Sequence, residues 1–216
     1  MKASLLGPVG SGKGTQAQLV LGKLNYARMS TGDLVRNQIE SNTELGRELK
    51  GYSDQGEPLL DETIIELVWP HLQPVGAWIL DARPHTIEQA HMLDEELKER
   101  SGGLDQVIVL EGPSNEELIE RITSGRRQSL ATGRVYHLEH DPPTDSEEGE
   151  DSGPLVQLED DTEEAIRRQI ETYFDEAEAI KEHYEEQGIL VVIDADQDPQ
   201  KVTEDIIEAL GDAQRR

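Results

Sequence analysis

Short apolar runs alternate along the chain with longer segments in which apolar residues recur at helical spacing. Four runs have the length and composition of buried strands: residues 2–6, 77–80, 107–110 and 189–193. Helical segments are predicted at residues 14–24, 43–53, 61–72, 86–99, 114–123, 162–187 and 199–210, with a further helix start at Ser30, whose capping-box acid is Asp33. Apolar strands that alternate with helices predict an α/β fold with a mostly parallel sheet covered on both faces.

One segment, residues 124–161, departs from this alternation. It is rich in Gly, Pro, Ser and acidic residues, and it contains Pro142-Pro143 followed by a largely acidic run at 145–153. Such a composition predicts an inserted flap of short strands and loops. The 216 residues fit one α/β domain with small insertions.

The charge balance is strongly acidic. The chain has 46 acidic and 20 basic residues, a formal net charge of −26. Because such a surface repels nucleic acid and anionic lipid, we predict neither as a partner. Two interpretations of the acidity stay open: an ordinary solvated surface, and adaptation to high salt, which screens the repulsion between like charges.

Cysteine content and hydropathy indicate the compartment. There is no Cys, which excludes disulfides and thiolate zinc sites and favours a reducing environment. No apolar run approaches the roughly 20 residues that span a bilayer. A glycine-rich motif begins already at Gly7, which leaves no room before it for a signal peptide. We therefore predict a cytoplasmic protein.

The glycine-rich motif has the pattern of a phosphate-binding loop. Residues 7–15 read Gly-Pro-Val-Gly-Ser-Gly-Lys-Gly-Thr, between a predicted strand and a predicted helix. Glycines allow backbone N–H groups to turn towards phosphate oxygens, and the helix N-terminus adds partial positive charge. Lys13 is placed to reach the β- and γ-phosphates, and the Thr15 hydroxyl lies near the phosphates and their metal.

Several stretches make the chain resemble the adenylate kinase family. The loop ends in Lys-Gly-Thr-Gln at residues 13–16, and Ser-Thr-Gly-Asp-Leu-Val-Arg at 30–36 resembles the family's monophosphate-side segment. Asp-Ala-Arg-Pro-His-Thr at 81–86 occupies the place of the family's Asp-Gly-Phe-Pro-Arg. Residues 125–127 and 133–137 resemble the start of the family's lid, 153–161 its end, and 188–191 the last strand. The similarity covers almost the whole chain.

The resemblance implies a fold and a division into parts. The expected fold is the P-loop NTPase three-layer α/β fold, with a mostly parallel five-stranded sheet and two insertions. The core would comprise residues 1–29, 60–124 and 162–216, the monophosphate-binding flap residues 30–59, and the lid residues 125–161. The family members transfer a phosphoryl group from Mg-ATP to AMP, and the resemblance implies a monomer.

The resemblance also implies roles for individual residues. ATP would be bound by Gly10, Ser11, Gly12, Lys13, Gly14, Thr15, Arg126, Val135, Tyr136 and Gln197. AMP would be bound by Thr31, Arg36, Glu57, Pro58, Leu59, Ala82, Arg83, Pro84, His85 and Gln89, of which Gln89 would read the adenine. The catalytic set would be Lys13, Arg121, Arg126, Asp81 and Asp33, the two aspartates orienting hydrated Mg²⁺.

Some of these residues also have a plainer interpretation. Arg36 and Gln89 would serve as solvated helix residues, and Arg121 would pair with Glu117 one helical turn away. Asp81 would be a turn residue.

Three positions depart from the family's phosphate-binding arginines: they carry His85, Leu158 and Gln169. These side chains cannot reproduce the bidentate, permanently charged contacts of a guanidinium. Arg83, Arg168 or a protonated His85 are candidate replacements, although Arg168 is turned by about 100° around its helix from Gln169.

Ala82 is a fourth departure, because it adds a methyl group where the family has glycine. Most of the departures fall on the monophosphate side or between the two phosphates, and the ATP-side loop is intact. Three functions stay open: an AMP kinase, a kinase for another nucleoside monophosphate, and a nucleotide-binding sensor with little phosphotransfer.

The predicted lid has no family zinc site and an unusual charge. His137, His140, Asp141 and Asp151 offer metal-binding atoms, but we interpret them as solvated lid residues, with no zinc. Between Leu138 and Ile166 the sequence has no Lys or Arg, while acids are abundant. The hypothesis that follows is that lid closure over ATP needs high ionic strength or additional Mg²⁺.

Overall fold

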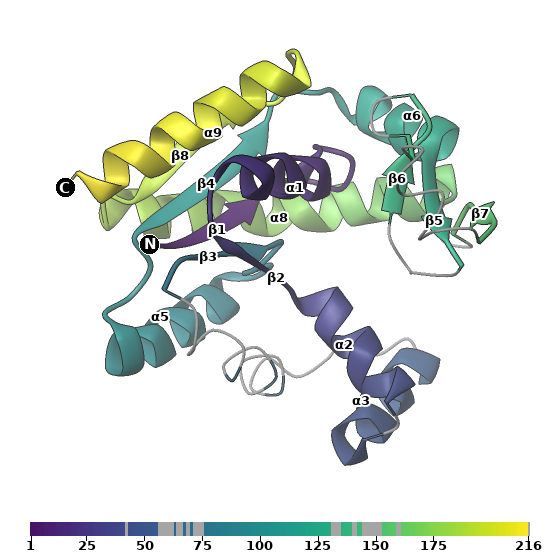
Figure 1. The fold of residues 1–216 in the computed structure, drawn as a ribbon, viewed down its shortest axis with the longest axis horizontal. Coiled ribbons are helices and arrows are strands. Elements are labelled where there is room, and N and C mark those ends of the chain that lie inside the picture. Colours follow the sequence, from purple (N-terminus) through teal and green to yellow (C-terminus); the bar gives the residue numbers. More distant parts are fainter. Residues whose placement is uncertain are drawn as a thin grey trace.

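The computed structural model describes residues 1–41, 43–55, 63, 67, 70, 76–130, 135–139, 142–143, 153–158 and 161–215, with the backbone alone at residues 32, 33, 36, 40, 52–55 and 101. Five strands form one sheet in the order β2-β3-β1-β4-β8, and every pair in it is parallel (Figure 1). The strands are β1 (Lys2–Leu6), β2 (Ala27–Ser30), β3 (Trp78–Asp81), β4 (Gln106–Glu111) and β8 (Leu190–Asp194). The predicted α/β class and parallel sheet are confirmed.

The edge strand β2 is the one strand of this sheet that the apolar runs did not locate. It has only four residues, and Ala27 and Met29 alternate in it with Arg28 and Ser30. Met29 is buried and Ala27 packs beside it in the core, so the polar pair belongs to the other face of the strand. Ser30 ends β2 and directly precedes α2 (Thr31–Glu40), at the position predicted for the cap.

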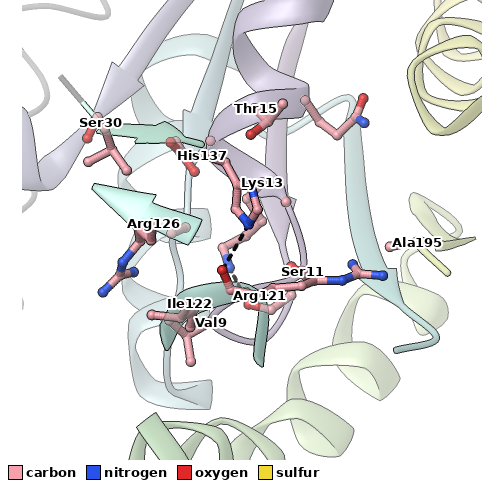
Figure 2. A pocket seen from close by; sticks show the side chains of 18 of the residues that line it. Val9, Ser11, Lys13, Thr15, Ser30, Arg121, Ile122, Arg126, His137 and Ala195 are labelled. Atoms are coloured by element: carbon pink, nitrogen blue, oxygen red, sulfur yellow. Dashed lines mark hydrogen bonds between the residues drawn. The ribbon is translucent and has the colours of Figure 1, made fainter. Parts of the chain in front are cut away.

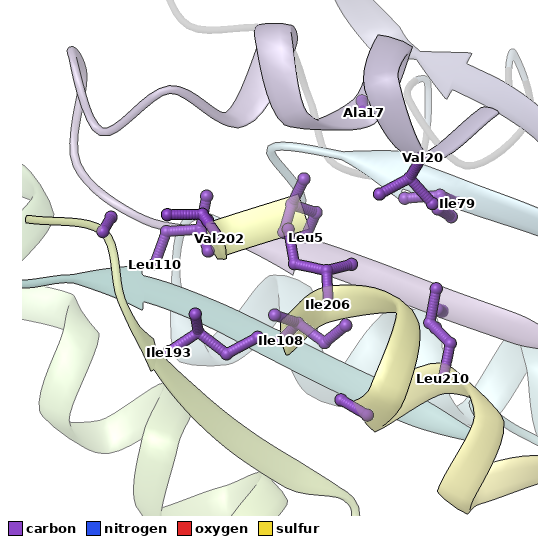
Figure 3. Packing of buried hydrophobic residues seen from close by; sticks show 13 residues of the cluster. Leu5, Ala17, Val20, Ile79, Ile108, Leu110, Ile193, Val202, Ile206 and Leu210 are labelled. Atoms are coloured by element: carbon purple, nitrogen blue, oxygen red, sulfur yellow. The ribbon is translucent and has the colours of Figure 1, made fainter. Parts of the chain in front are cut away.

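Helices cover both faces of the sheet and complete the three layers. On one face, α1 (Lys13–Lys23) and α9 (Pro199–Gln214) contribute Ala17, Val20, Val202, Ile206 and Leu210 to a buried cluster (Figure 3). On the other face, α5 (Ile87–Ser101) and α8 (Glu163–Glu186) contribute Ala90, Leu93, Leu97, Ile180 and Tyr184. The core therefore lies in two layers, one on each side of the sheet.

The central strand β4 shows why these segments form a doubly covered parallel sheet. Val107 and Val109 belong to the cluster under α5 and α8, whereas Ile108 and Leu110 belong to the cluster under α1 and α9. A strand buried on both faces needs an unbroken run of β-branched and aliphatic residues, which residues 107–110 supply.

Two groups of elements extend beyond the sheet. The helices α2 and α3 (Glu44–Gln55) follow β2 and project from its end (Figure 1). After α6 (Asn115–Gly125), a small antiparallel sheet is formed by β5 (Arg126–Ser129), β6 (Val135–His137) and β7 (Leu155–Val156) in the order β6-β5-β7. The predicted short strands of 124–161 are confirmed, although residues 124 and 125 still belong to α6.

Side-chain caps fix the starts of several of the described helices, α5, α6 and α8 among them. Thr86, Ser114 and Thr162 precede α5, α6 and α8, and each accepts a hydrogen bond from a backbone N–H in the first turn. The helix predicted at 61–72 lies mostly outside the described residues; Thr63, Leu67 and Pro70 are helical. Among the described helices, none combines the length and the apolar character that a bilayer crossing requires.

Candidate active site

The loop between β1 and α1 has the backbone geometry that a phosphate cradle requires. Gly10 has φ of 84°, and a Cβ on it would lie 2.7 Å from the Leu118 carbonyl oxygen, so a larger residue does not fit there. Gly12 precedes α1 in the left-handed conformation and supplies no side-chain cap. The first N–H groups of α1 therefore lack a side-chain acceptor, and the helix end suits an anion.

Lys13 lies inside this loop. Its Nζ donates hydrogen bonds to the carbonyl oxygens of Gly7 at 2.7 Å and Pro8 at 2.8 Å. Burial of the ammonium group lowers the pKa of Lys13 to about 8; the Asp81 carboxylate acts in the opposite direction, and Arg126 adds to the lowering. A phosphate at the loop would stabilise the ammonium form.

The loop forms one wall of a cleft whose volume is about 1580 Å³. Ligand pockets usually have volumes of about 300–1,000 Å³, so the cleft offers more space than one small ligand needs. Its lining comes from the phosphate loop, from helices α1, α2, α6 and α8, from strands β2, β3, β5 and β6, and from the start of α9 with the segment before it. Figure 2 shows Lys13 between the side chains of Arg121 and Arg126, which extend in different directions.

Arg121, Arg126 and Arg168 belong to the cleft lining and come from α6, β5 and α8. Arg121 Nη2 lies 3.4 Å from Asp196 Oδ1, beyond β8. Arg121 also contributes, after the hydrogen bonds with Ser114, to lowering the pKa of Glu117, so it has a contact besides the one in its own helix. Arg168 lies on the same cleft-lining stretch of α8 as Gln169, so the rotation between them does not remove it from the cleft. It pairs with Glu164 at 3.3 Å and its side chain is 69% exposed.

Arg126 is held by a carboxylate that has no exposed surface. Arg126 Nε donates to Asp161 Oδ2 at 3.0 Å and its Nη2 donates to Asp161 Oδ1. The Asp161 side chain is 0% exposed and that of Arg126 is 24% exposed. This bidentate pair joins the start of β5 to the segment just before α8.

On the other side of the phosphate loop, Asp81 at the end of β3 is paired with Arg28 of β2. Arg28 donates to Asp81 Oδ2 from Nε at 3.0 Å and from Nη2 at 2.6 Å. Both residues line the cleft. Asp81 is therefore more than the turn residue of the plainer interpretation, since its carboxylate also acts on Lys13.

Two buried hydroxyls near the phosphate loop and at the start of α2 have no hydrogen-bond partner among the described residues. They are Ser11 Oγ, within the loop, and Thr31 Oγ1. Buried polar atoms normally have partners, and a ligand is one reason for an exception. Both residues belong to the predicted nucleotide-binding set, Ser11 for ATP and Thr31 for AMP.

The turn after β3 has an unusual backbone and an internal network. Ala82 has φ of 63°, the left-handed region that favours glycine. Arg83 Nη1 donates to Gln89 Oε1 at 2.9 Å, and the His85 N–H donates to the same oxygen at 2.8 Å. Arg83 does not line the cleft, whereas Ala82 and His85 do.

The surroundings of His85 disfavour a positive charge on its ring. It is exposed on the cleft, yet protein atoms displace solvent from around its ring and, with Arg83 and Lys13, lower its pKa to about 3. The neutral imidazole does not replace the guanidinium that the family has here.

Polar contacts hold together the part of the cleft formed by α1 and the start of α9. Gln16, the last residue of the Lys-Gly-Thr-Gln motif, donates to the Pro199 carbonyl at 2.9 Å and accepts from the Thr203 hydroxyl at 2.7 Å, so it joins α1 to α9. Gln197 donates to the Asp194 carbonyl at 2.8 Å and to Asp205 at 2.9 Å. Tyr136 is buried and Val135 is exposed, and both line the cleft, as does Gln197.

The structure brings most of the predicted residues together. Those that line the cleft are Gly10, Ser11, Gly12, Lys13, Gly14, Thr15, Asp81, Ala82, His85, Arg121, Arg126, Val135, Tyr136 and Gln197. Thr31, Arg83, Pro84 and Gln89 are described but are not in its lining. Glu57, Pro58, Leu59 and the side chains of Asp33 and Arg36 lie outside the described residues, as do His140, Asp141 and Asp151.

Sequence reasoning missed Arg28 because it did not place a strand at residues 27–30. The available signal was the two-residue alternation of Ala27 and Met29 with Arg28 and Ser30. That alternation, together with the position of β2 beside β3, brings a guanidinium to Asp81.

Three features define a P-loop phosphotransferase: a parallel sheet between two layers of helices, a glycine-rich loop at a helix N-terminus, and a cleft lined by cationic side chains. The chain belongs to the adenylate kinase family: the family model described as adenylate kinase matches residues 5–189. It is thereby a nucleoside monophosphate kinase, and the family predicted from the sequence is confirmed.

Curated relatives are similar to the chain over nearly its whole length. The chain is 38% identical to the adenylate kinase of Alkaliphilus oremlandii over 215 residues, which cover 98% of this chain and 99% of the relative. It is 37% identical to the adenylate kinase of Clostridium perfringens (strain SM101 / Type A) over 215 residues, 98% of this chain and 99% of the relative. The adenylate kinase of Fusobacterium nucleatum is 38% identical over 210 residues, 96% of this chain and 97% of the relative.

Proposed function

We propose that the protein transfers the γ-phosphoryl group of Mg-ATP reversibly to AMP and so forms two ADP. The observation that carries the proposal is a continuous cleft of about 1580 Å³ that joins the phosphate loop to β2 and the end of β3. Relatives named adenylate kinase along the full length of the chain support the same acceptor. They do not favour a different acceptor or a binding protein without catalysis.

The chemistry needs positioning and positive charge. An oxygen of the AMP phosphate bonds to the γ-phosphorus while the bond from that phosphorus to the β,γ-bridging oxygen breaks, and the electron pair leaves with ADP. No protein nucleophile is required, so the residues act by aligning the two phosphates and stabilising their charge. Exclusion of water by lid closure prevents hydrolysis.

We assign the residue roles by their positions along the cleft and by the family resemblance. Lys13 and the first N–H groups of α1 hold the β- and γ-phosphates, with Ser11 and Thr15 beside them. Arg121 and Arg126 contact the triphosphate oxygens from the lid side, and Val135, Tyr136 and Gln197 border the adenine and ribose. Thr31, Arg36 and the turn 82–85 bind the monophosphate, whose base Gln89 reads, and residues 57–59 complete that wall.

Asp81 fits a place in a hydrated magnesium site. Its carboxylate lines the cleft near Lys13, and carboxylate oxygens suit Mg²⁺, which keeps several waters and bridges phosphates when one or two carboxylates are present. Among the described side chains, no cluster of three or more His, Cys, Asp or Glu residues forms a separate metal site. When bound with ATP, Mg²⁺ neutralises developing charge on the phosphates, and Asp81 with Asp33 would orient its waters.

We propose the three-part division and the setting on the same basis. The core comprises residues 1–29, 60–124 and 162–216, the monophosphate flap residues 30–59 and the lid residues 125–161. The acidic surface supports a monomer that binds neither nucleic acid nor membranes, and the lack of Cys supports the reducing environment of the cytoplasm.

A direct assay of ADP formation tests the proposal. Mg-ATP and AMP are incubated with the protein at about 0.1 M and about 2 M KCl, conditions that differ strongly in screening, and Lys13→Ala serves as the blank. ADP formation above the blank is the expected result. ATP binding without ADP formation in either salt would contradict it, and a panel of other nucleoside monophosphates then separates a different acceptor from a binding protein.

A further inference from the structure

Helix α8 connects the surroundings of the phosphate loop with those of the turn after β3. Ile166 and Ile170 of α8 are buried against α6, in a cluster on which Val9 of the phosphate loop also packs. Two to three turns further along α8, Glu176 accepts a hydrogen bond at 3.3 Å from the N–H of Ile87, at the start of α5 and just beyond the turn after β3. The part of α8 between these contacts therefore lies between the phosphate loop and the proposed acceptor side.

This part of α8 presents a strip of side chains to the cleft. Those in the lining are Ala165, Arg168, Gln169, Thr172 and Tyr173. Residues three or four apart are neighbours on a helix surface, so Arg168 adjoins Ala165 on one side and Thr172 on the other. Arg168 is the cation that this strip brings to the cleft, one position before the residue that replaces the family's arginine.

Arg168 is held less firmly than Arg126, which lines the same cleft. Arg126 donates to both oxygens of Asp161, whose side chain has no exposed surface. Arg168 Nη1 instead lies 3.3 Å from Glu164 Oε1, and the two side chains are 69% and 84% exposed. An exposed ion pair one helical turn apart contributes little stability and is screened by salt. The Arg168 guanidinium can therefore leave Glu164 for a phosphate, which accepts stronger bidentate hydrogen bonds.

We propose that Arg168 turns from Glu164 onto the γ-phosphoryl group while that group passes from ATP to AMP, and so takes the role that an arginine at position 169 would have. The inference rests on the proposed transfer to AMP. Arg168 donates hydrogen bonds to oxygens of the transferred group and exchanges no proton, so the bonds that form and break are those of the transfer itself. Because charge spreads over these oxygens in the transition state, the contact raises kcat more than it tightens ATP binding.

The test compares ADP formation from Mg-ATP and AMP with Mg-ATP binding, both measured on the full chain at about 2 M KCl. Arg168→Gln is expected to lower kcat by roughly 10²–10³-fold and to leave the Kd of Mg-ATP within about threefold. Arg167→Gln is the matched control, because it removes the same charge from the next position of α8. Arg167 pairs with Glu163 and Glu116 and does not line the cleft, so both quantities should stay close to wild type.

Two further variants distinguish phosphate binding from a structural role of the ion pair. Glu164→Gln breaks the pair but keeps the guanidinium, so kcat should stay within about threefold of wild type. Arg168→Gln/Gln169→Arg moves the guanidinium by one position and is expected to recover kcat to within about tenfold of wild type. The double variant does not restore the ion pair, because position 169 is five residues from Glu164 and faces another side of the helix.

Distinct results overturn distinct statements. If the wild-type chain forms no ADP, the proposed function fails and the inference with it. If the wild type is active, the role of Arg168 alone is overturned by an unchanged kcat in Arg168→Gln, by an equal loss in Arg167→Gln or Glu164→Gln, or by the absence of recovery in the double variant. Arg168→Lys keeps the charge beside Glu164 but loses the planar fork, so it carries the test if Arg168→Gln does not fold; its kcat should also fall, and an unchanged value overturns the proposal.

Discussion

At the scale of single residues, the protonation of Lys13 depends on its burial in the phosphate loop. Its ammonium group is bonded to two carbonyl groups of its own loop, and burial lowers its pKa to about 8. Since desolvation disfavours the cation, the cost is present at pH values below 8 and disappears as the pH rises from 8 towards the ordinary value of 10.5. Bound phosphates reverse the balance by stabilising the charged form.

We expect ATP binding to take up protons near pH 8. With a pKa of about 8, close to half of the Lys13 side chains are neutral at that pH before binding, so uptake approaches about half a proton per ATP. Calorimetry in buffers of different ionisation enthalpy measures this number. Lys13→Met should abolish the uptake, and equal uptake in the variant would show that another group is responsible.

Ala82 is a second residue whose local geometry has a measurable consequence. A non-glycine residue at φ of 63° destabilises the folded state by roughly 1–2 kcal/mol. Glycine avoids this strain, but its more flexible unfolded chain costs about 0.5–1 kcal/mol on folding. We therefore expect Ala82→Gly to raise the free energy of unfolding by up to about 1 kcal/mol in urea titrations. Ala179→Gly on the exposed face of α8 is the control and should lower it by about 1 kcal/mol. Two changes of the same sign would contradict this account of Ala82.

At the scale of elements, the Arg126–Asp161 pair fastens the small antiparallel sheet to α8. The pair joins residues 35 positions apart, and the carboxylate has no exposed surface. The contact stands at one base of the predicted lid, next to the cleft. Because Arg126 donates to both oxygens of Asp161, the pair fixes the position of the Arg126 guanidinium.

The two halves of this pair should not contribute equally to stability. Arg126→Met leaves a buried carboxylate without its partner and is expected to lower the free energy of unfolding by roughly 3–5 kcal/mol. Asp161→Asn leaves a guanidinium that is 24% exposed and reaches water, so its effect should be smaller. Urea unfolding measures both, with Arg167→Met, a surface ion-pair variant, as a control close to wild type. Equal losses for Arg126→Met and Asp161→Asn would argue against the asymmetry.

At the scale of the whole molecule, the net charge of −26 affects both the stability of the fold and the binding of nucleotides. Self-repulsion opposes the compact state, and the acidic sequence between Leu138 and Ile166, the predicted lid, would oppose the approach of a polyanionic nucleotide. The screening length falls from about 10 Å at 0.1 M to about 3 Å at 1 M salt, which weakens both effects.

We expect both stability and turnover to rise between about 0.1 M and about 2 M KCl. The urea midpoint and direct ADP formation, quantified by chromatography so that no salt-sensitive coupling enzyme intervenes, are the measurements. An uncharged osmolyte is the control, because it stabilises compact proteins without screening charge. Equal activity at the two salt concentrations would contradict the hypothesis that closure depends on ionic strength.

The sequence by itself determined the features that depend on neighbours along the chain. Apolar runs predicted four of the five strands of the parallel sheet, and the phosphate loop was identified because its glycines, Lys13 and flanking elements form one contiguous pattern. Capping residues such as Thr86 and Ser114 act within one helical turn, which is why the starts of α5 and α6 were predicted closely. The family followed from motifs of this local kind.

Only the tertiary structure decided which charges meet in the cleft. The pairing of β2 with β3 brings Arg28 to Asp81 across 53 positions, and β2 itself is too short and half polar to stand out. Likewise, the bond from Arg83 to Gln89 and the presence of Arg168 in the cleft lining depend on side-chain direction. The lateral order of strands and the direction of long side chains are set by packing between distant segments, and periodicity along the chain carries no record of either.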